Sequence, residues 1–162
     1  AVSACQQGRN VLVIDCDVRR RSLTRTLGFD PDEGIIEACA SPEDWREFVG
    51  EEDEVGLHFI PASRFSTGWG PESGPGLSRL LEALRDHYEL IVLDSPPVLA
   101  STDARLITSM ADKIVMVTAW DRTPLPLVRR AMSLLQNRPP PVAGVYVNRV
   151  PPQFRFGRLR GD

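Results

Sequence analysis

The sequence predicts an α/β fold with a mainly parallel sheet, and three observations support this prediction. Two apolar runs rich in β-branched residues, Val11–Asp15 and Leu90–Asp94, each end abruptly in a carboxylate, as buried parallel strands do at the ligand-binding edge of a sheet. Strand-like and helix-like segments alternate along the chain, which favours a parallel sheet covered on both faces. The 162 residues are 42% hydrophobic and 25% charged, a composition typical of one globular domain.

The first half of the chain is expected to contain two strands separated by short helices. Residues 1–7 are typical of the end of a helix, with Gly8 as its terminator. After the strand over 11–15, Ser22 is a candidate cap for a helix over 23–27 that Gly28 closes. Further helices are expected over 34–40 and after Ser41-Pro42, and a strand over 57–61. Residues 62–76, rich in Ser, Gly and Pro, predict a loop.

The second half continues the alternation of helices and strands. Leucines at 77, 80, 81 and 84 form one helical stripe that leads into the strand over 90–94. Thr102 is expected to cap a helix to Ala111, and Thr123-Pro124 to open a helix that ends at Gln136. Strands are expected over 114–118 and 142–148, the second after a break at Pro139–Pro141.

Composition excludes several classes of protein. A net charge of −3 argues against a dedicated nucleic-acid binder. No apolar run approaches the roughly 20 residues that span a bilayer. The three cysteines, Cys5, Cys16 and Cys39, are odd in number and lack CxxC spacing, which suits a reducing cytoplasm. Cys16 is expected to be a small filler and not a nucleophile, because the flanking acids would raise its pKa.

The two carboxylate-ended strands carry longer motifs. The first continues as Asp15-x-Asp17-x-Arg19, and the second as Asp94-Ser-Pro-Pro-Val98 followed by Thr102-Asp103-Ala104. These motifs resemble the nucleotide-binding motifs of the bacterial tyrosine kinases of polysaccharide export, the BY-kinases, within the deviant Walker ATPases. Residues 6–10, 20–23 and 144–150 add to the resemblance, which runs from residue 1 to about 150 and is poor over 50–76.

The resemblance implies a three-layer fold similar to that of P-loop NTPases. The phosphate-binding loop ending in Gly-Lys-Ser/Thr does not occur in these 162 residues. Its expected place is before residue 1, so we expect an N-terminally truncated domain that lacks the first strand and the phosphate loop. Residues 1–150 would form this partial ATPase domain, and residues 151–162 a flexible basic tail. The fragment by itself is expected to be marginally stable and inactive.

The resemblance also assigns roles to residues, with ATP and Mg²⁺ as cofactors. Asp17 and Asp94 would organise the Mg²⁺ shell, while Asp15 would be the base for a tyrosine hydroxyl. Arg19 would belong to the catalytic centre, in a basic cluster with Arg20 and Arg21 that contacts phosphate or a neighbouring protomer. Asn148 and Arg149 would bind the nucleotide at the adenine.

A structural alternative exists for each of these assignments. The acids can simply cap strand ends or neighbouring helices. The arginine cluster can be a solvated loop, and Asn148 a strand terminator.

The predicted function is that of a cytoplasmic, ATP-dependent protein-tyrosine autokinase that regulates exopolysaccharide or capsule polymerisation and export. Its partners would be a transmembrane polysaccharide co-polymerase, fused or separate, and further copies of itself in a ring, with no nucleic acid. The co-polymerase would hold the domain at the inner face of the membrane.

Two alternatives stay open. The tail has phenylalanines, Phe154 and Phe156, where the resembled kinases carry phosphorylated tyrosines, and the two tyrosines of the chain, Tyr88 and Tyr146, are expected to be packing residues. This departure favours a nucleotide-dependent regulator or pseudokinase of the same system. A partition or division-site ATPase that acts as a switch is the other alternative.

Overall fold

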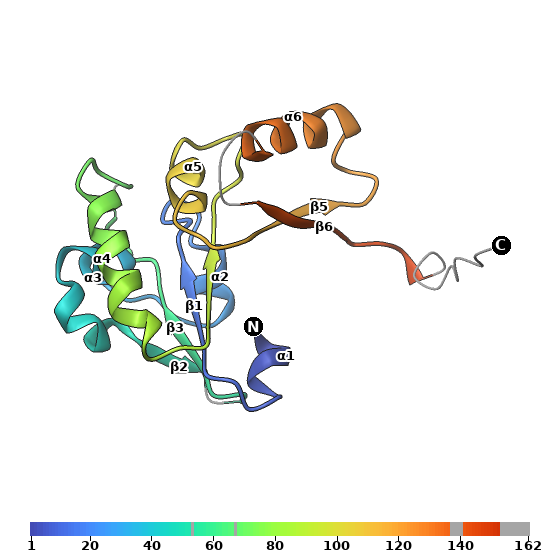
Figure 1. Ribbon diagram of the computed structural model, residues 1–162. Helices are drawn as coiled ribbons and strands as arrows, with labels where there is room; N and C mark the ends of the chain where they lie inside the picture. The colour runs from blue at the N-terminus through green and yellow to red at the C-terminus, as the bar shows by residue number, and fades with distance from the viewer. Residues whose placement is uncertain (53, 67, 137–140, 153–162) are drawn as a thin grey trace. The chain divides into compact units, whose positions relative to one another are not determined.

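A computed structural model describes residues 1–52, 54–66, 68–136 and 141–152. The chain divides into two compact units, Ala1–Ile107 and a second unit that begins at Thr108, and each is described by itself. Figure 1 shows the elements of both units. Within the described ranges, no helix combines the length and the apolar character needed to cross a membrane.

The first unit is built on a four-stranded sheet in the order β2-β3-β1-β4. Its strands are β1 (Val11–Asp15), β2 (Gly50–Glu52), β3 (Leu57–Ile60) and β4 (Leu90–Asp94). β1 is parallel to both β3 and β4, whereas β2 is antiparallel to β3. The prediction of an α/β fold with a mainly parallel sheet is therefore confirmed. The sequence does not predict β2, because a Gly-Glu-Glu segment shows no apolar alternation.

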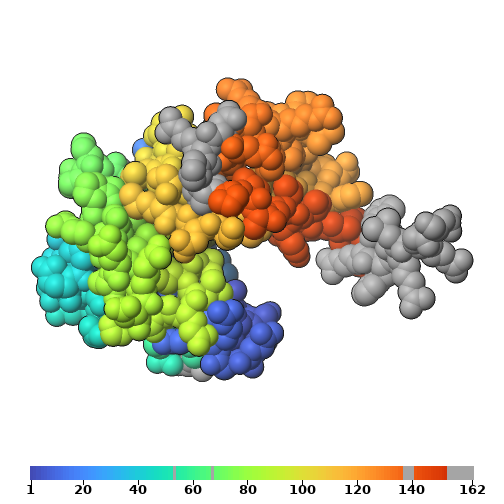
Figure 2. All heavy atoms as spheres, viewed as in Figure 1, coloured from blue at the N-terminus to red at the C-terminus, as the bar shows by residue number. Residues whose placement is uncertain are grey.

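Helices cover this sheet. They are α1 (Val2–Cys5), α2 (Ser22–Thr26), α3 (Ile35–Ala40), the 3₁₀ helix η1 (Pro42–Phe48), α4 (Ser73–Arg85) and α5 (Asp103–Thr108). In Figure 1, α3 and α4 lie together on one side of the sheet. In the space-filling view of Figure 2, α4 (green) forms much of the visible surface of the first unit.

The core of the first unit is formed by the two faces of β1. Val11 and Val13 are buried with Leu57 and Phe59 of β3, and residues of α1 and α2 pack against this cluster. The intervening residues of β1, Leu12 and Ile14, are fully buried as well. A strand buried on both faces reads as a continuous apolar run, which is why the sequence predicts β1 to the residue.

The boundaries of two helices differ from the predicted ones. α4 begins at Ser73, inside the segment predicted as a loop, and Gly76 in its first turn lies against the backbone of Cys39 in α3. The Gly and Pro residues that predict a loop here allow this close approach of two helices. α5 begins at Asp103, whose N–H donates to the Ser101 hydroxyl at 3.1 Å, and it ends at Thr108, before the predicted Ala111.

The two tyrosines have different environments. Tyr88 is buried, and its hydroxyl lies 2.8 Å from Nδ1 of His58. The ring of Trp45 stands edge-on to the ring of Tyr88, with 5.9 Å between the centroids. Tyr146 is 60% exposed on β6. The prediction of a packing role is therefore confirmed for Tyr88 and wrong for Tyr146.

The second unit contains β5 (Ile114–Ala119), α6 (Leu125–Gln136) and β6 (Val142–Asn148), with β5 parallel to β6. Val115, Val117 and Tyr146 lie on one face of this pair and are each 60% exposed or more. A two-stranded sheet with such a face is marginally stable in water. The predicted break at Pro139–Pro141 lies mostly outside the described residues, as does the tail from residue 153 on.

Among the described glycines of the first unit, Gly34 leaves the least room for a side chain. It precedes α3, and a methyl group there would collide with the carbonyl oxygen of Pro61 and lie 2.8 Å from the backbone nitrogen of Ser63. That carbonyl accepts the N–H of Ile35 at 2.9 Å, so the contact joins α3 to the end of β3.

We therefore expect Gly34→Ala to lower the free energy of unfolding by about 1–3 kcal/mol. Gly144→Ala in β6 is the matched control, because a methyl group there meets nothing within 4 Å. Urea denaturation followed by circular dichroism measures both variants. Equal stability of the two variants would contradict the description of the α3 to β3 contact.

Candidate functional site

Three acidic residues meet where β1 and β4 end. Asp15 and Asp94 are aligned in the parallel ladder, and the N–H of Cys16 donates to the Asp94 carbonyl at 2.9 Å. Asp17 follows in the turn after β1. Asp15 is fully buried and Asp17 is 9% exposed, while Asp94 lies at the exposed end of its strand. The strand-end geometry that the sequence predicts thus brings these three carboxylates to one edge of the sheet.

The Asp15 carboxylate is held by three hydrogen bonds. Oδ2 accepts the Thr24 hydroxyl at 2.7 Å and the Thr24 N–H at 2.9 Å. Oδ1 accepts the N–H of Asp17 at 3.1 Å. The Thr24 hydroxyl in turn accepts the N–H of Ala62 at 2.9 Å. One carboxylate therefore ties together the end of β1, the first turn of α2 and the segment after β3.

This network explains how α2 begins. Ser22 is the first helical residue and not the predicted cap, and Arg21 at the cap position has a left-handed backbone with φ 53° and no side-chain cap bond. The unpaired N–H at the third helical position belongs to Thr24, and Asp15 accepts it from the neighbouring strand. A carboxylate that accepts such an N–H does the work of an N-cap residue. The structural alternative for Asp15, a helix cap, is thus realised.

Asp94 is the carboxylate of this edge whose pKa is raised. Desolvation, followed by the charges of Asp15 and Asp17, raises the pKa of Asp94 to about 6. Carboxylates that repel one another suit a cation, and oxygen ligands are those that Mg²⁺ prefers. In the described part of the chain, however, no group of three or more acidic, His or Cys side chains has the geometry of a complete metal site. The predicted binding of Mg²⁺ by Asp17 and Asp94 stays a prediction.

The turn after β1 orders Asp17 and the arginines. The N–H of Arg20 donates to Asp17 Oδ1 at 3.2 Å, and the N–H of Arg21 to the Asp17 carbonyl at 2.7 Å. The side chains of Arg19 and Arg20 are exposed. Arg21 is buried, and it donates to the Ala62 carbonyl at 3.1 Å and to Asp30 at 2.8 Å. A solvated loop is therefore the wrong description for Arg21, which joins α2 to the segment after β3.

Two residues of this edge escape sequence reasoning. Thr24 is fully buried beside Asp15, and Trp69 donates its indole N–H to the Cys16 carbonyl at 3.0 Å, between the two acids of the first motif. Thr24 looks like an ordinary helix residue, and Trp69 lies in the segment with the poorest family match. The sequence signal that could have pointed to Trp69 is its position as a single Trp in a Gly- and Pro-rich stretch.

Cys16 behaves as the sequence predicts. It is fully buried, and burial raises the pKa of its thiol well above the usual value, with Cys39, Asp15 and Asp94 adding to the shift. A thiol held protonated in this way is a poor nucleophile. The prediction that Cys16 is a small filler is confirmed.

Asn148 and Arg149 end β6 in the second unit. Asn148 Oδ1 accepts the N–H of Arg149 at 2.8 Å, and the Asn148 carbonyl accepts the N–H of Trp120 at 2.8 Å. Arg149 has a left-handed backbone with φ 61°. These contacts end the strand, and the predicted contact with the nucleotide stays a prediction.

Comparison with known proteins first defines the class. No family model matches the chain. The cell-division protein MinD from Aquifex aeolicus is 20% identical and superposes with a TM-score of 0.72 over 93% of this chain and 61% of its own. At this identity the likeness shows the fold alone. The chain has the fold of the P-loop NTPases.

The comparisons then define the family. EpsB from Ralstonia nicotianae (strain ATCC BAA-1114 / GMI1000), whose name assigns it as a tyrosine-protein kinase, is 31% identical in an alignment of 157 residues that covers 93% of this chain and 20% of EpsB. The succinoglycan biosynthesis transport protein ExoP from Rhizobium meliloti (strain 1021) is 28% identical over 88% of this chain and 19% of its own length. The BceF tyrosine kinase domain is 30% identical, with a TM-score of 0.74 over 93% of this chain and 60% of that domain.

The names of these relatives belong to the same family that the motifs at the carboxylate edge resemble. The chain belongs to the bacterial tyrosine kinase family, the BY-kinases. It spans about a fifth of the length of EpsB and of ExoP.

Asp94 gives the site a dependence on pH. Since the pKa of Asp94 is raised to about 6, the folded protein binds an extra proton between about pH 4 and pH 6, and stability falls as the pH rises through this window. Asp94→Asn has an amide that does not ionise, so the variant should not lose this stability as the pH rises. At pH 7.5 we expect the variant to be more stable than the wild type by on the order of 1 kcal/mol after solvent screening, or about 2–4 °C in Tm.

At pH 4 the two proteins should melt together. Asp86→Asn, at an exposed position after α4, is the control and should leave the Tm unchanged at both pH values. Differential scanning calorimetry without divalent cations measures the differences. A Tm of Asp94→Asn below that of the wild type at pH 7.5 would contradict the assigned cost of ionising Asp94, which comes from desolvation and then from the charges of Asp15 and Asp17.

Proposed function

We propose that this chain is part of an ATP-dependent protein-tyrosine kinase that regulates the polymerisation and export of an exopolysaccharide or capsule. The observation that carries the proposal is the meeting of Asp15, Asp17 and Asp94 at one sheet edge, in the motifs of a family whose relatives include a tyrosine kinase domain and a succinoglycan transport protein. Phosphoryl transfer depends mainly on positioning and on neutralising charge, and carboxylates that hold a cation supply the second requirement.

In this proposal Asp17 and Asp94 hold Mg²⁺ together with the phosphates of ATP. The bound ion would neutralise charge on the transferred phosphoryl group. The pKa of Asp94, raised first by desolvation and then by the charges of Asp15 and Asp17, supports the assignment, because a nearby cation would favour the ionised carboxylate. Arg19, exposed in the turn after Asp17, would contact phosphate, and Asn148 and Arg149 would contact the adenine.

For Asp15 the geometry favours a positioning role over that of a base. Both of its oxygens accept hydrogen bonds, and the side chain is fully buried. A general base must lie within hydrogen-bond reach of the proton that it takes, and the Asp15 carboxylate is fully buried among the three protein groups that donate to it. We therefore propose that Asp15 fixes Asp17 through the Asp17 N–H. The predicted role as base is the second candidate.

The surroundings of the kinase follow from the family. We propose that it works in the cytoplasm at the inner face of the membrane, next to a transmembrane co-polymerase, fused or separate, and that it forms a homo-oligomeric ring. A regulator or pseudokinase is the second candidate function, because residues 151–162 carry Phe154 and Phe156 and no tyrosine. A partition or division-site switch is the third, since MinD shares the fold.

Phosphotyrosine analysis separates these functions. The product of the complete reading frame is incubated with ATP and Mg²⁺ and probed for phosphotyrosine. We expect the wild type to be phosphorylated, and Asp17→Asn and Asp94→Asn each to reduce the rate about 10- to 100-fold or more. Asp86→Asn should leave it unchanged. The 162-residue chain by itself should not bind ATP in a calorimetric titration, because it contains no Gly-Lys-Ser/Thr loop.

Two outcomes would overturn the kinase proposal. Binding of ATP by the complete product without any phosphotyrosine would favour the pseudokinase. Binding of DNA or lipid vesicles that depends on ATP, again without phosphotyrosine, would favour the switch.

A further inference from the structure

The indole of Trp69 contacts the carboxylate edge, although the family motifs and the proposed function assign it no role. Its Nε1–H donates to the carbonyl oxygen of Cys16 at 3.0 Å. This carbonyl lies between Asp15 and Asp17, the two acids of the first motif. The side chain of Trp69 is half-buried. A segment that is distant in sequence thus reaches the turn that carries Asp17.

The peptide group between Cys16 and Asp17 is held at both of its polar ends. Its carbonyl oxygen accepts the indole N–H of Trp69, and its N–H donates to Asp15 Oδ1 at 3.1 Å. Because a peptide group is planar, fixing these two ends fixes the orientation of the whole plane. That orientation sets the φ angle of Asp17 and so the direction in which its side chain leaves the backbone. Trp69 therefore acts on Asp17 through one peptide group.

Trp69 is itself supported by α4. The N–H of Gly70 donates to Ser73 Oγ at 2.9 Å, and the N–H of Ser73 donates to the Gly70 carbonyl at 3.1 Å. Ser73 is the first residue of α4 and is buried. Because the residue that follows Trp69 is bonded in this reciprocal way, the indole reaches Cys16 from a fixed support, as a positioning group requires.

The same segment also contacts the chain on the other side of Asp17. A methyl group at Gly68 would lie 3.7 Å from Nη2 of Arg19, so the guanidinium group of Arg19 lies against the backbone of Gly68. Gly68 has a φ of 124°, a conformation that favours glycine. Residues 68–69 thus contact both Cys16 and Arg19, which flank Asp17.

We propose that Trp69 is a positioning residue, whose indole N–H sets the orientation of the Cys16–Asp17 peptide and thereby holds the Asp17 carboxylate at the sheet edge that Asp94 shares. The proposal rests on the proposed function, in which Asp17 and Asp94 hold Mg²⁺. Trp69 acts through Asp17 and touches neither the ion nor the phosphates. Removing a group that orients a metal ligand typically weakens the binding of the metal.

Trp69→Phe tests this role, because phenylalanine keeps an aromatic ring and lacks the N–H. The rate of tyrosine phosphorylation by the product of the complete reading frame is measured at saturating ATP while the Mg²⁺ concentration is varied. We expect the Mg²⁺ concentration that gives half the maximal rate to rise about tenfold. The maximal rate should stay within about threefold of the wild-type rate, because saturating Mg²⁺ compensates for weaker binding.

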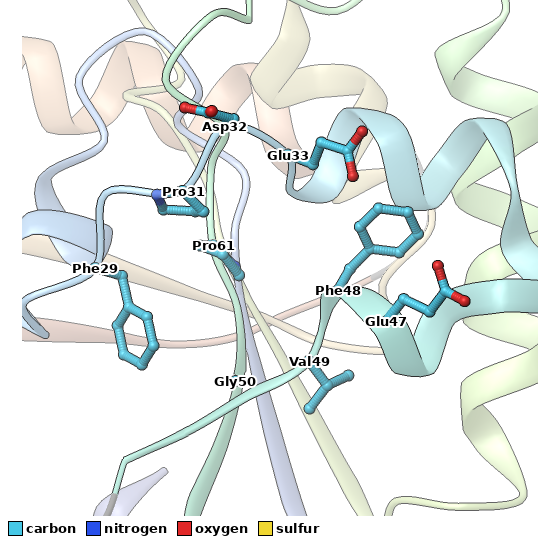
Figure 3. Close-up of a pocket in the computed structure, with 9 residues that line it drawn as sticks. All are labelled: Phe29, Pro31, Asp32, Glu33, Glu47, Phe48, Val49, Gly50 and Pro61. Atoms are coloured by element: carbon cyan, nitrogen blue, oxygen red, sulfur yellow. The ribbon is translucent and has the colours of Figure 1, made fainter.

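Two aromatic residues outside the carboxylate edge provide matched controls. Trp45→Phe makes the same change at a buried position, where Trp45 packs on Tyr88 before the start of β4, whereas Asp94 ends this strand. Phe48→Leu removes a ring that is half-buried, as Trp69 is, from a cleft of about 560 Å³ whose lining residues include none of the predicted site (Figure 3). Neither control should shift the dependence on Mg²⁺, whatever its effect on stability.

Hydrogen exchange without nucleotide or divalent cations measures the hold on the peptide group itself. In Trp69→Phe the amide proton of Asp17 should exchange roughly threefold faster or more, because its local opening becomes easier. The amide proton of Val13, in the middle of β1, should keep its wild-type rate. If Trp69 only stabilised the fold, both amides would exchange faster by the same factor. In the two controls the ratio of these rates should equal that of the wild type.

Three outcomes would each overturn the role of Trp69. They are an unchanged Mg²⁺ dependence of Trp69→Phe, an equal shift in either control, and equal acceleration of the Asp17 and Val13 amides. A failure of the proposed function has a different signature, because the wild type would then show no phosphotyrosine. The exchange ratio, which requires no nucleotide, would in that case decide whether Trp69 holds the Cys16–Asp17 peptide.

Discussion

Three hydrogen bonds converge on the carboxylate of Asp15 at the point where β1 leaves the sheet. Because the group is fully buried, leaving it without partners would cost several kcal/mol. Thr24 supplies two of the donors, and its hydroxyl also accepts the N–H of Ala62 after β3. The start of α2, the turn that carries Asp17 and the segment after β3 are thus fixed by one group.

This constraint separates the roles of three neighbouring acids. Asp15 is satisfied by protein donors, whereas Asp94 at the adjacent strand end is exposed and has a raised pKa. The ionised Asp94 therefore lowers the stability of the folded protein at neutral pH and keeps negative charge at the sheet edge. Such a trade is typical of a binding site, since a cation or a ligand that brings one would recover the loss.

Sequence reasoning succeeds here where burial dictates residue type. The bounds of β1 agree with the predicted ones because a parallel strand buried on both faces tolerates few polar residues. The bounds of β4, a half-buried apolar run that also ends in an acid, agree as well. It fails where a tertiary contact replaces a local signal. Asp15, and not Ser22, supplies the cap interaction of α2, and Gly76 lies inside a helix because α3 approaches it closely. The buried position of Arg21 depends on Ala62 and Asp30, which no local pattern links to it.

The hydroxyl of Thr24 tests the central claim most directly. Thr24→Val keeps the shape of the side chain but removes the hydroxyl, whereas Thr24→Ser keeps the hydroxyl and removes a methyl group. If the Asp15 network organises this edge, Thr24→Val should be less stable than Thr24→Ser by about 1–3 kcal/mol in urea denaturation. In Thr24→Val, the amide protons of Ala62 and Asp17 should also exchange with solvent at least tenfold faster than in Thr24→Ser. Equal stability of the two variants, with unchanged exchange at both amides, would contradict the account.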